Sequence, residues 1–500
     1  MKLYDFQMLG VGRLVQSERL FLADDMGLGK TIQAIRAAEE LDAKKILVVC
    51  QNSMKGMIRS VPKNGVMVTE YIGGWAEEIH TWAPGKSIGV VEGPASYRKF
   101  MVKCSDINYL IINYEALVGK TGIDLAAELS RHWDVIIFDE HHKIKNRNAK
   151  STKACKKICK DADYIWMLSG TPLLNHGQEM WPPLNMMFPK DKKYASYWRF
   201  VRGHCDVQRG VFGWEVKDIV DPNHPRAKAL RNTIQPLMLR RTKPEVLKDM
   251  PAKTIKKVWV ELHGEQLEAY LEMEKDMLAH FNDETITAAA VIAQIIRLKQ
   301  ITVGPELMFK EMEGISGAKI TAFLDILEAN DDKKLVVFSQ FRTALERLGK
   351  YLVDSRRVTG RQLAYLTGSV PMPIRNQAVS DFQEKEDPRI LFITTQAGGT
   401  GLTLTAASTA VFLDKLWGPQ LNIQAQDRLH RIGQKEPVTI IELLAENSVE
   451  LKIEALLKHK QNLFDWIIES EEALAARDEM VFQEKMSGKQ LLEELFGHLV

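Results

Sequence analysis

Residues 24–31 read DDMGLGKT and have the composition of a loop that cradles phosphate. The stretch follows an apolar run at Leu20–Ala23 and precedes a helical pattern, so backbone N–H groups and a helix dipole would face a bound anion. Lys30 could reach the β- and γ-phosphates of a nucleotide, and the Thr31 hydroxyl could ligate Mg²⁺. Asp24 stands where a strict phosphate loop has its first glycine, so an ordinary glycine-rich turn is the alternative interpretation.

A second group of polar residues, DEHH at 139–142, ends another apolar run. Asp139 could hold Mg²⁺ through its water shell, and Glu140 could orient a water molecule for attack on phosphorus. An Asp-Glu pair is by itself a weak signal, and a solvated strand end is its default interpretation. Its combination with Lys30, on another strand of the same predicted sheet, indicates nucleotide hydrolysis. The two histidines that follow could indicate a metal site, but no further ligand pattern accompanies them.

Two further motifs contain residues suited to couple separate sites. LSGTP at 168–172 places hydroxyl groups at a strand end, where they could relay hydrogen bonds. QAQDRLHRIGQ at 424–434 contains Arg428 and Arg431. Arginines three residues apart share one face of a helix, and two guanidinium groups from a separate domain could act as arginine fingers on a bound nucleotide. A surface helix that carries two arginines is the alternative.

The composition excludes several classes of protein. Its 500 residues predict two to four domains, and 45% apolar with 26% charged residues rules out a wholly disordered, fibrous or membrane-embedded chain. Five scattered cysteines and the lack of an apolar leader indicate a reducing, intracellular compartment. The uncharged stretch Ile390–Leu413 is too rich in threonine and glycine for a membrane helix, and we expect a strand, a loop and a strand there.

Charge is nearly balanced over the whole chain but not locally. The net charge is +2, so any surface that binds nucleic acid must be a local patch. Between residues 143 and 160 there are eight basic residues and no acidic one. This run could contact phosphates, and a solvated basic helix is the alternative.

Short apolar runs alternate with helical patterns twice along the chain, which predicts two α/β domains with parallel sheets. The strands predicted for the first domain are Leu20–Ala23, Ile46–Cys50, Tyr109–Asn113, Val135–Asp139 and Ile165–Leu168. Those predicted for the second are Leu335–Ser339, Ala364–Thr367, Ile390–Thr394, Ala410–Asp414 and Thr439–Leu443. Between the two domains, over residues 180–310, the pattern changes to helices, including Gly264–Phe281 and Thr287–Gln300.

The acidic tail Ser470–Val500 is predicted to be helical, with an amphipathic stripe that is more typical of a packing face than of a partner-docking helix.

Taken in order, these motifs resemble those of the Swi/Snf-related branch of helicase superfamily two, the ATP-driven double-stranded DNA translocases. YDFQ at 4–7 is similar to the family's adenine-contacting motif, and LMLRRTKPEVLKDMPAK at 237–253 is similar to a signature that few other proteins carry. The resemblance implies ATP and Mg²⁺ as cofactors, with Thr31 and Asp139 as the metal-binding residues. The catalytic residues are then Lys30, Asp139, Glu140, Arg428 and Arg431. The ATP-binding residues are Gln7, Asp25, Met26, Gly27, Leu28, Gly29, Lys30 and Thr31.

The same resemblance implies residues that contact DNA and residues that couple those contacts to the nucleotide. The implied DNA contacts are Lys55, Asn113, Lys143, Lys145, Asn146, Thr395, Gln396 and Trp417. The implied coupling residues are Ser169, Gly170, Thr171, Gly399 and Gln424. The chain departs from the family pattern at Gln51, where proline is usual, and at Trp417-Gly418-Pro419, where a WNP-like triplet is usual.

The largest departure is an insertion at Met57–Gly74. Asn64-Gly65 between two β-prone runs predicts a hairpin with a type I′ turn there. The two interpretations of this insertion are a passive surface feature and a hairpin that carries Arg59 and Lys63 toward DNA.

We therefore predict an α/β protein with two RecA-like parallel-sheet lobes and helical insertions between and on them. The predicted divisions are an ATP-binding lobe at 1–179, its helical insertion at 180–255, a helical protrusion of the second lobe at 256–315, the second lobe itself at 316–470 and an acidic helical tail at 471–500.

The predicted function is ATP-dependent movement along double-stranded DNA, in replication-fork, recombination or repair transactions. A strand-separating DNA helicase and an ATP-switched DNA-binding protein are the alternatives. A chromatin remodeller is less expected, because no histone-reading segment is recognisable. The expected partner is double-stranded or forked DNA, the C-terminal helix is a candidate contact for a protein, and no membrane is involved. The expected location is intracellular, in the cytoplasm or on the nucleoid if the source is a prokaryote or a virus.

Overall fold

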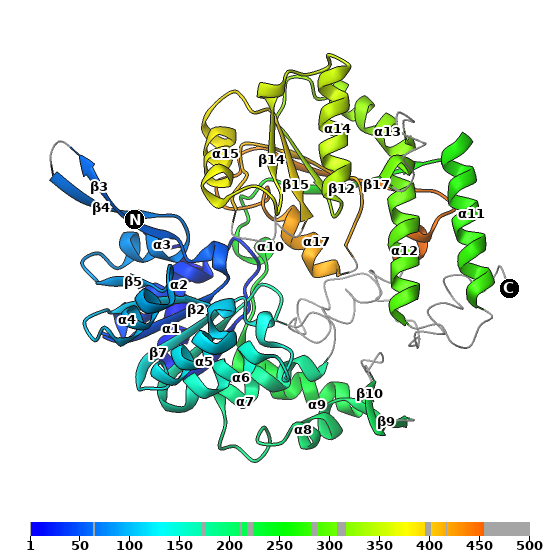
Figure 1. The fold of residues 1–500 in the computed structure, drawn as a ribbon. Coiled ribbons are helices and arrows are strands. Elements are labelled where there is room, and N and C mark those ends of the chain that lie inside the picture. The colour runs from blue at the N-terminus through cyan, green and yellow to red at the C-terminus, as the bar shows by residue number, and fades with distance from the viewer. Residues whose placement is uncertain are drawn as a thin grey trace. The chain divides into compact units, whose positions relative to one another are not determined.

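The computed structural model describes residues 2–63, 66–172, 177–210, 213–217, 224–281, 288–307, 317–395, 402–416 and 418–454. The chain forms two compact units that divide between Lys248 and Asp249. We call residues 2–248 the first lobe and residues 249–454 the second lobe, and each is described by itself (Figure 1). No helix among the described residues is long and apolar enough to cross a membrane.

A seven-stranded parallel sheet forms the centre of the first lobe, in the order β11-β1-β8-β7-β2-β6-β5. Its strands are β1 (Arg19–Leu22), β2 (Ile46–Cys50), β5 (Ile88–Val90), β6 (Tyr109–Asn113), β7 (Trp133–Asp139), β8 (Ala162–Leu168) and β11 (Met238–Leu239). Successive residues of a strand point to opposite faces of the sheet. In β2, Leu47 and Val49 belong to one hydrophobic cluster, and Ile46 and Val48 belong to the other. Burial on both faces explains why a central strand such as β2 is apolar throughout.

Helices cover both faces of this sheet. The cluster that includes Val48 is completed by α1 (Asp5–Gln16), α2 (Lys30–Glu40) and α3 (Gly74–Trp82). The cluster that includes Val49 is completed by α4 (Ala95–Lys103), α5 (Gly119–Glu128), α6 (Lys150–Ile158), α7 (Trp181–Met187), α8 (Tyr197–His204) and α9 (Pro225–Ile234). A short helix, α10 (Lys243–Val246), follows β11.

Two antiparallel hairpins are separate from the central sheet of the first lobe. They are formed by β3 (Met57–Lys63) with β4 (Val66–Ile72) and by β9 (Asp206–Gly210) with β10 (Gly213–Lys217). Lys63 pairs with Val66, so two residues connect β3 to β4, in agreement with the predicted hairpin. The predicted turn residues 64 and 65 lie outside the described residues.

A six-stranded parallel sheet forms the centre of the second lobe, in the order β12-β17-β16-β13-β15-β14. Its strands are β12 (Lys253–Val260), β13 (Leu335–Ser339), β14 (Leu363–Leu366), β15 (Ile390–Thr394), β16 (Thr409–Phe412) and β17 (Val438–Ala445). Its helices are α11 (Gly264–Phe281), α12 (Ala288–Val303), α13 (Ala318–Glu328), α14 (Arg342–Asp354), α15 (Met372–Glu384) and α17 (Pro419–Gln426). Val337 and Phe338 of β13 enter different hydrophobic clusters, so this sheet too is buried on both faces.

The predicted α/β class with two parallel sheets is confirmed, and all ten predicted strands are present. The prediction that residues 180–310 are helical is wrong in part, because β9, β10, β11 and β12 lie in that stretch. β12 is the edge strand of its sheet, where Lys256 and Lys257 are exposed, so it lacks the apolar run of a central strand. The finer division into insertions and protrusions stays a prediction, and the predicted tail at 471–500 lies outside the described residues.

Candidate functional site

The predicted phosphate loop joins β1 to α2 in the first lobe. Gly29 is the N-cap of α2, and its φ of 75° lies in the left-handed region that favours glycine. A Cβ on Gly29 would also come within 2.4 Å of Gln7 Nε2, so a larger residue at this position would displace the Gln7 side chain. Lys30 and Thr31 are the first two residues of α2, and their backbone N–H groups therefore lie at a helix N-terminus, where an anion is favoured.

The Lys30 ammonium lies against the backbone of the loop. Its Nζ donates hydrogen bonds to the carbonyl oxygens of Asp24, at 2.7 Å, and Asp25, at 3.1 Å. Desolvation lowers the pKa of Lys30, and the carboxylates of Glu140 and Asp24 oppose that shift. A cation that is withdrawn from water and bonded to neutral carbonyls would gain from an anionic partner such as phosphate.

Gln7 contacts the loop from α1. Its Nε2 donates to the Leu28 carbonyl at 3.2 Å, and its Oε1 accepts from the Tyr4 backbone N–H at 3.1 Å. Gln33 of α2 donates to the same Leu28 carbonyl, also at 3.2 Å. The two amides fix the loop between α1 and α2. The structure therefore brings Gln7 to the loop, and its contact with adenine stays a prediction.

The carboxylate pair lies at the end of β7, and each member has its own partners. Asp139 Oδ2 accepts a hydrogen bond from Trp75 Nε1 at 2.9 Å. Glu140 has a φ of 49°, a left-handed conformation that turns the chain out of the strand. Its Oε2 accepts from Ser169 Oγ at 2.9 Å and lies 3.2 Å from His142 Nδ1. Both carboxylates are therefore held in defined orientations.

The two carboxyl groups differ in their acidity. Burial raises the pKa of Asp139 to about 6, the charge of Glu140 adds to the rise, and the hydrogen bond from Trp75 opposes it. Burial also acts to raise the pKa of Glu140, but the hydrogen bond and charge of His142, with the charge of Lys30, outweigh burial and lower it to about 2. Glu140 is therefore ionised at neutral pH. Asp139 is the carboxylate that a divalent cation would stabilise more.

The predicted coupling residues 169–171 connect Glu140 to the end of β1, just before the loop. The Ser169 backbone N–H donates to the Leu22 carbonyl at 3.2 Å, at the end of β1. The Ser169 hydroxyl, which donates to Glu140, also accepts from the Thr171 backbone N–H at 3.1 Å. Ser169 and Thr171 are both fully buried. A continuous hydrogen-bonded path thus runs from Glu140 into the 168–172 segment.

Two residues of the loop region that sequence reasoning missed are Arg240 and Arg241. β11 pairs with β1 in parallel, with Leu239 opposite Leu22, so the two arginines emerge beside the start of the loop. Arg240 Nη2 lies 2.8 Å from Asp25 Oδ1, and Arg241 Nε donates to Asp24 Oδ1 at 2.9 Å. The sequence contains the two acidic residues and the two arginines, but only the pairing of β11 with β1 shows that their side chains are in contact.

These ion pairs also explain the departure at Asp24 from a strict phosphate loop. The Asp24 side chain is fully buried and pairs with Arg241. Gln33 Nε2 donates to Asp24 Oδ2 at 3.2 Å, and Arg241 Nη2 donates to Gln33 Oε1 at 2.8 Å. Asp24 is thus part of a buried charge network that ties the loop to the segment after β11.

A separate cavity of about 410 Å³ in the first lobe contains two of the predicted DNA contacts, Lys55 and Asn113. Its other lining residues are Asn52, Val91, Glu92, Gly93, Arg98, Glu115 and Ala116. Lys55 is only 6% exposed, yet its polar contacts are long. Its Nζ lies 3.4 Å from the Val91 carbonyl and 4.0 Å from Glu92 Oε2. Desolvation lowers the pKa of Lys55, so a bound anion would stabilise its charged form too.

The remaining predicted first-lobe contacts lie beside the carboxylate pair. Lys143 and Asn146 are exposed, whereas Lys145 is half-buried with its Nζ 3.0 Å from Glu179 Oε1. In the basic run that follows, the five lysines of α6 and its C-terminal turn are exposed, namely Lys150, Lys153, Lys156, Lys157 and Lys160. Arg147 instead lies over the Tyr197 ring, 3.9 Å from its centroid. Lys156 Nζ lies over the Trp181 ring, 5.6 Å from its centroid, so the run is an exposed basic face in which Arg147 and Lys156 also contact aromatic rings.

In the second lobe, the prediction that Arg428 and Arg431 share a helix face is wrong. α17 ends at Gln426, and both arginines follow in turns. Tertiary hydrogen bonds replace the helical pattern: the Arg428 carbonyl accepts from the Leu404 N–H, at 2.9 Å. Arg428 is 2% exposed, and Arg431 Nε donates to the Asp427 carbonyl at 3.0 Å.

The other second-lobe predictions are only partly within the described residues. Gln424 is buried in α17. Thr395 is also buried, and its hydroxyl has no hydrogen-bond partner among the described residues. Gln396, Gly399 and Trp417 lie outside the described residues.

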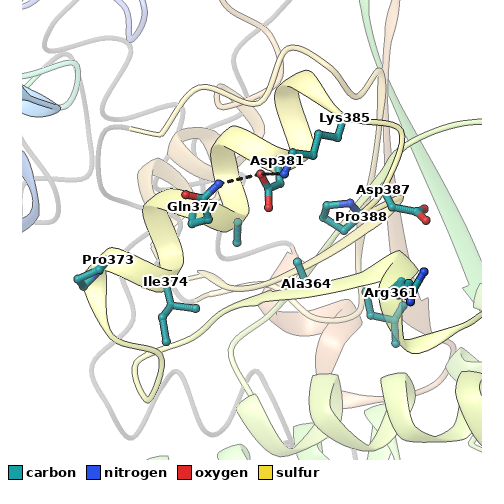
Figure 2. A pocket seen from close by; sticks show the side chains of 11 residues that line it. Arg361, Ala364, Pro373, Ile374, Gln377, Asp381, Lys385, Asp387 and Pro388 are labelled. Atoms are coloured by element: carbon teal, nitrogen blue, oxygen red, sulfur yellow. Dashed lines mark hydrogen bonds and ion pairs between the residues drawn. The ribbon is translucent and has the colours of Figure 1, made fainter. Parts of the chain in front are cut away.

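A second cavity and a possible metal-binding cluster contain none of the predicted site residues. The second cavity has a volume of about 570 Å³ and lies between β14 and α15. Figure 2 shows its lining side chains, among which Gln377 and Lys385 both contact Asp381. The side chains with the spacing of metal ligands, among those described, are His132, Asp134 and Asp163 at the start of β7 and β8. They do not include the histidines at 141 and 142.

A family model of the SNF2-related domain matches residues 9–307, and a model of the helicase conserved C-terminal domain matches residues 318–433. The first match alone covers more than half of the chain. The chain therefore belongs to the SNF2-related family of helicase superfamily two, as its motifs predicted.

Individual relatives are similar over nearly all of this chain. YwqA of Bacillus subtilis (strain 168), provisionally named an ATP-dependent helicase/translocase, is 31% identical over 488 residues, which are 95% of this chain and 48% of that protein. The DNA annealing helicase and endonuclease ZRANB3 of Homo sapiens is 28% identical over 473 residues, which are 92% of this chain and 40% of that protein. The chain thus spans half or less of the length of these relatives. The solved SWI2/SNF2 ATPase core of Sulfolobus solfataricus in complex with dsDNA is 25% identical, with 95% of this chain and 94% of that chain covered and a TM-score of 0.41.

Proposed function

We propose that this chain is an ATP-driven motor that moves along double-stranded DNA without separating its strands. The observation that carries the proposal is the arrangement within the first lobe of a phosphate loop, an oriented carboxylate pair and a second, loosely bonded lysine in its own cavity. The first two belong to a nucleotide hydrolase, and the third offers a place for a DNA phosphate. Family membership supports both parts.

The nucleotide site fits ATP with Mg²⁺. Backbone N–H groups at the start of α2 and the Lys30 ammonium suit the phosphates. The Thr31 hydroxyl and an Asp139 carboxylate oxygen are hard oxygen donors of the kind that Mg²⁺ prefers, and the raised pKa of Asp139 fits a group that a dication stabilises. When bound, Mg²⁺ would neutralise charge that develops on the phosphates.

Glu140 is the residue that acts on water. Because its pKa is lowered, it is ionised at neutral pH and can accept a hydrogen bond from an attacking water molecule. Ser169 and His142 hold the same carboxylate oxygen, so loss of a phosphate group near Glu140 can be transmitted through Ser169 to the 168–172 segment.

We propose that Arg428 and Arg431 of the second lobe act on the bound nucleotide as arginine fingers. An arginine finger stabilises negative charge in the transition state, and it acts only when the lobe that carries it closes on the nucleotide. Repeated closing and opening would move the DNA contacts of one lobe relative to those of the other, which is translocation. Gln424 of α17 lies in the same 424–434 segment as the two arginines. In this proposal it couples the closing of the lobes to the DNA contacts.

DNA binding is proposed to depend on phosphate contacts. The supporting observations are the cavity with Lys55 and Asn113 and the exposed lysines of the basic run. With a net charge of only +2, such local contacts must supply the affinity. Phosphate contacts carry no direct sequence information, so one site can be occupied by successive nucleotides during movement.

The test compares steady-state ATPase rates with duplex, single-stranded and forked DNA across a salt series. We expect duplex to stimulate hydrolysis and the stimulation to fall steeply with salt, because counterions are released when phosphates bind. Stimulation by single strands alone would contradict the proposal and favour a strand-separating helicase. An ATPase rate that no DNA changes would favour the ATP-switched binding protein.

A further inference from the structure

The β3–β4 hairpin is anchored at its base and exposed toward its tip. Figure 1 shows it extending from the first lobe beside α3, the helix that contacts both of its strands. Near the base, the Tyr71 ring stacks on His80 of α3, with 4.3 Å between ring centroids. Seven residue pairs, from Met57–Ile72 to Lys63–Val66, form its two-stranded sheet. The hairpin is thus a long feature with a fixed base.

The exposed end of the hairpin carries apolar side chains. Met67 is 64% exposed and Val68 is 38% exposed, and they pair across the hairpin with Pro62 and Val61. Apolar residues on an open two-stranded sheet favour aggregation, and such a sheet gains little stability from them. Their presence is consistent with a contact to another molecule. The charged residues of the hairpin are Arg59, Lys63 and Glu70, an excess of one positive charge.

The base of the hairpin is built onto the segment that carries Lys55. A Cβ on Gly56 would lie 2.0 Å from the Gly73 carbonyl oxygen, and one on Gly74 would lie 2.2 Å from the Met54 carbonyl oxygen. Only glycine therefore allows the two ends of the hairpin to approach so closely. The Lys55 carbonyl accepts a hydrogen bond from the Ala76 backbone N–H at 3.1 Å. The hairpin and the cavity proposed to hold a DNA phosphate are therefore fixed to one another.

We propose that the β3–β4 hairpin contacts the branch point of branched DNA, with Met67 and its cross-strand partner Pro62, which share one face of the hairpin, packed against an exposed base pair. This inference rests on the proposed function, because it requires the duplex to be held at the Lys55 cavity. DNA is favoured over a protein partner by this continuity with the phosphate contact and by the excess positive charge of the hairpin.

The energetics of stacking explain why a branch point is the expected ligand. Apolar side chains such as Met and Pro insert between base steps of a continuous duplex only at the cost of unstacking them. At a branch point the face of the last base pair is already uncovered, so the same side chains can bury apolar surface without that cost. The hairpin would thus make the motor prefer branched over linear duplex DNA.

The experiment measures the DNA concentration that half-saturates ATPase stimulation, for a forked duplex and for a linear duplex of the same length and composition. Wild type should need less of the forked DNA. The variant Met67→Ser should lose about tenfold in apparent affinity for the fork, equivalent to about 1.4 kcal/mol, and none for the linear duplex. Ile123→Ser, which changes a residue 67% exposed on α5, is the matched control and should retain the preference.

Equal half-saturation of wild type by the two DNAs would overturn the inference, as would an unchanged preference in the Met67→Ser variant. Either result leaves the proposed function standing, provided that the linear duplex still stimulates hydrolysis. If no duplex stimulates wild type, the proposed function fails first. A photo-crosslinking residue in place of Met67 provides a second measurement: crosslinks to branch-point nucleotides support the inference, and crosslinks to a protein partner alone would contradict it.

Discussion

Lys30 and Lys55 of the first lobe are both desolvated, and their surroundings differ. Lys30 makes hydrogen bonds of 2.7 and 3.1 Å to a loop whose Asp24 is itself held by Arg241. Lys55 has contacts of 3.4 and 4.0 Å in an open cavity. Desolvation lowers the pKa of both. The comparison fits the two roles proposed above, a preorganised nucleotide site for Lys30 and an adaptable DNA contact for Lys55.

The largest effect is expected for Lys30→Ala. ATP turnover should fall below detection, because the charge that faces the phosphates is lost. The fold should survive, since Lys30 contributes little to the hydrophobic core and the loop keeps its arginine contacts. Steady-state ATPase assays and thermal unfolding check both parts. Normal turnover would remove the phosphate-loop assignment.

Arg428→Ala and Arg431→Ala should each lower the ATPase rate by about 10³-fold, if they act as arginine fingers. ATP affinity should change much less, because such a finger acts mainly in the transition state. Arg342→Ala, at an exposed residue of α14, is the control and should be neutral. Because Arg428 is buried, unfolding curves must accompany its rate. A loss of tenfold or less for both would mean that the second lobe does not complete the site.

Arg241→Met tests how firmly the loop is held. It leaves the fully buried Asp24 carboxylate without its cation, which should lower the free energy of unfolding by about 3–5 kcal/mol. Adding Asp24→Ala should restore much of the stability, since the unpaired charge is then removed as well. Chemical denaturation measures the cycle. Additive losses in the double variant would show that the two residues do not interact.

The smallest effect is expected for Lys55→Met, which keeps the length of the side chain and removes its charge. Stability should hardly change, because the polar contacts of Lys55 are long. Affinity for duplex DNA should fall about tenfold, and the slope of log affinity against log salt should decrease by about one. The control is Lys99→Met, which removes an exposed lysine paired with Asp124. A large loss of stability with unchanged DNA affinity would make Lys55 structural.

The sequence predicted those parts of the fold that depend on local pattern. Strands such as Ile46–Cys50 and Leu335–Ser339 are apolar throughout because both of their faces are buried, and each was predicted with its observed bounds. Lys253–Val260 was missed because an edge strand can expose its lysines while its backbone pairs with β17. Pairing between segments that are distant in the sequence produces no local periodicity from which such a strand could be predicted.

The candidate site likewise has parts that follow from local pattern and parts that depend on the pairing of distant segments. The loop, the carboxylate pair and Ser169 were predicted from residue types at strand ends, where parallel strands bring them together. The contacts of Arg240 and Arg241 could not be predicted, because they depend on β11 lying beside β1. The end of α17 at Gln426 was also missed, and beyond it the Arg428 carbonyl accepts a hydrogen bond from the distant Leu404 N–H.

Displacement of a third strand from a DNA triplex tests the central claim most directly. The assay is run with wild type, ATP and a linear duplex that carries the third strand, next to an unwinding assay on a duplex with a short tail. We expect ATP-dependent displacement of the third strand, none with Lys30→Ala, and no unwinding of the tailed duplex, because a motor that grips the duplex backbone moves along it without parting the strands. Efficient unwinding without triplex displacement would contradict the account and identify a strand-separating helicase.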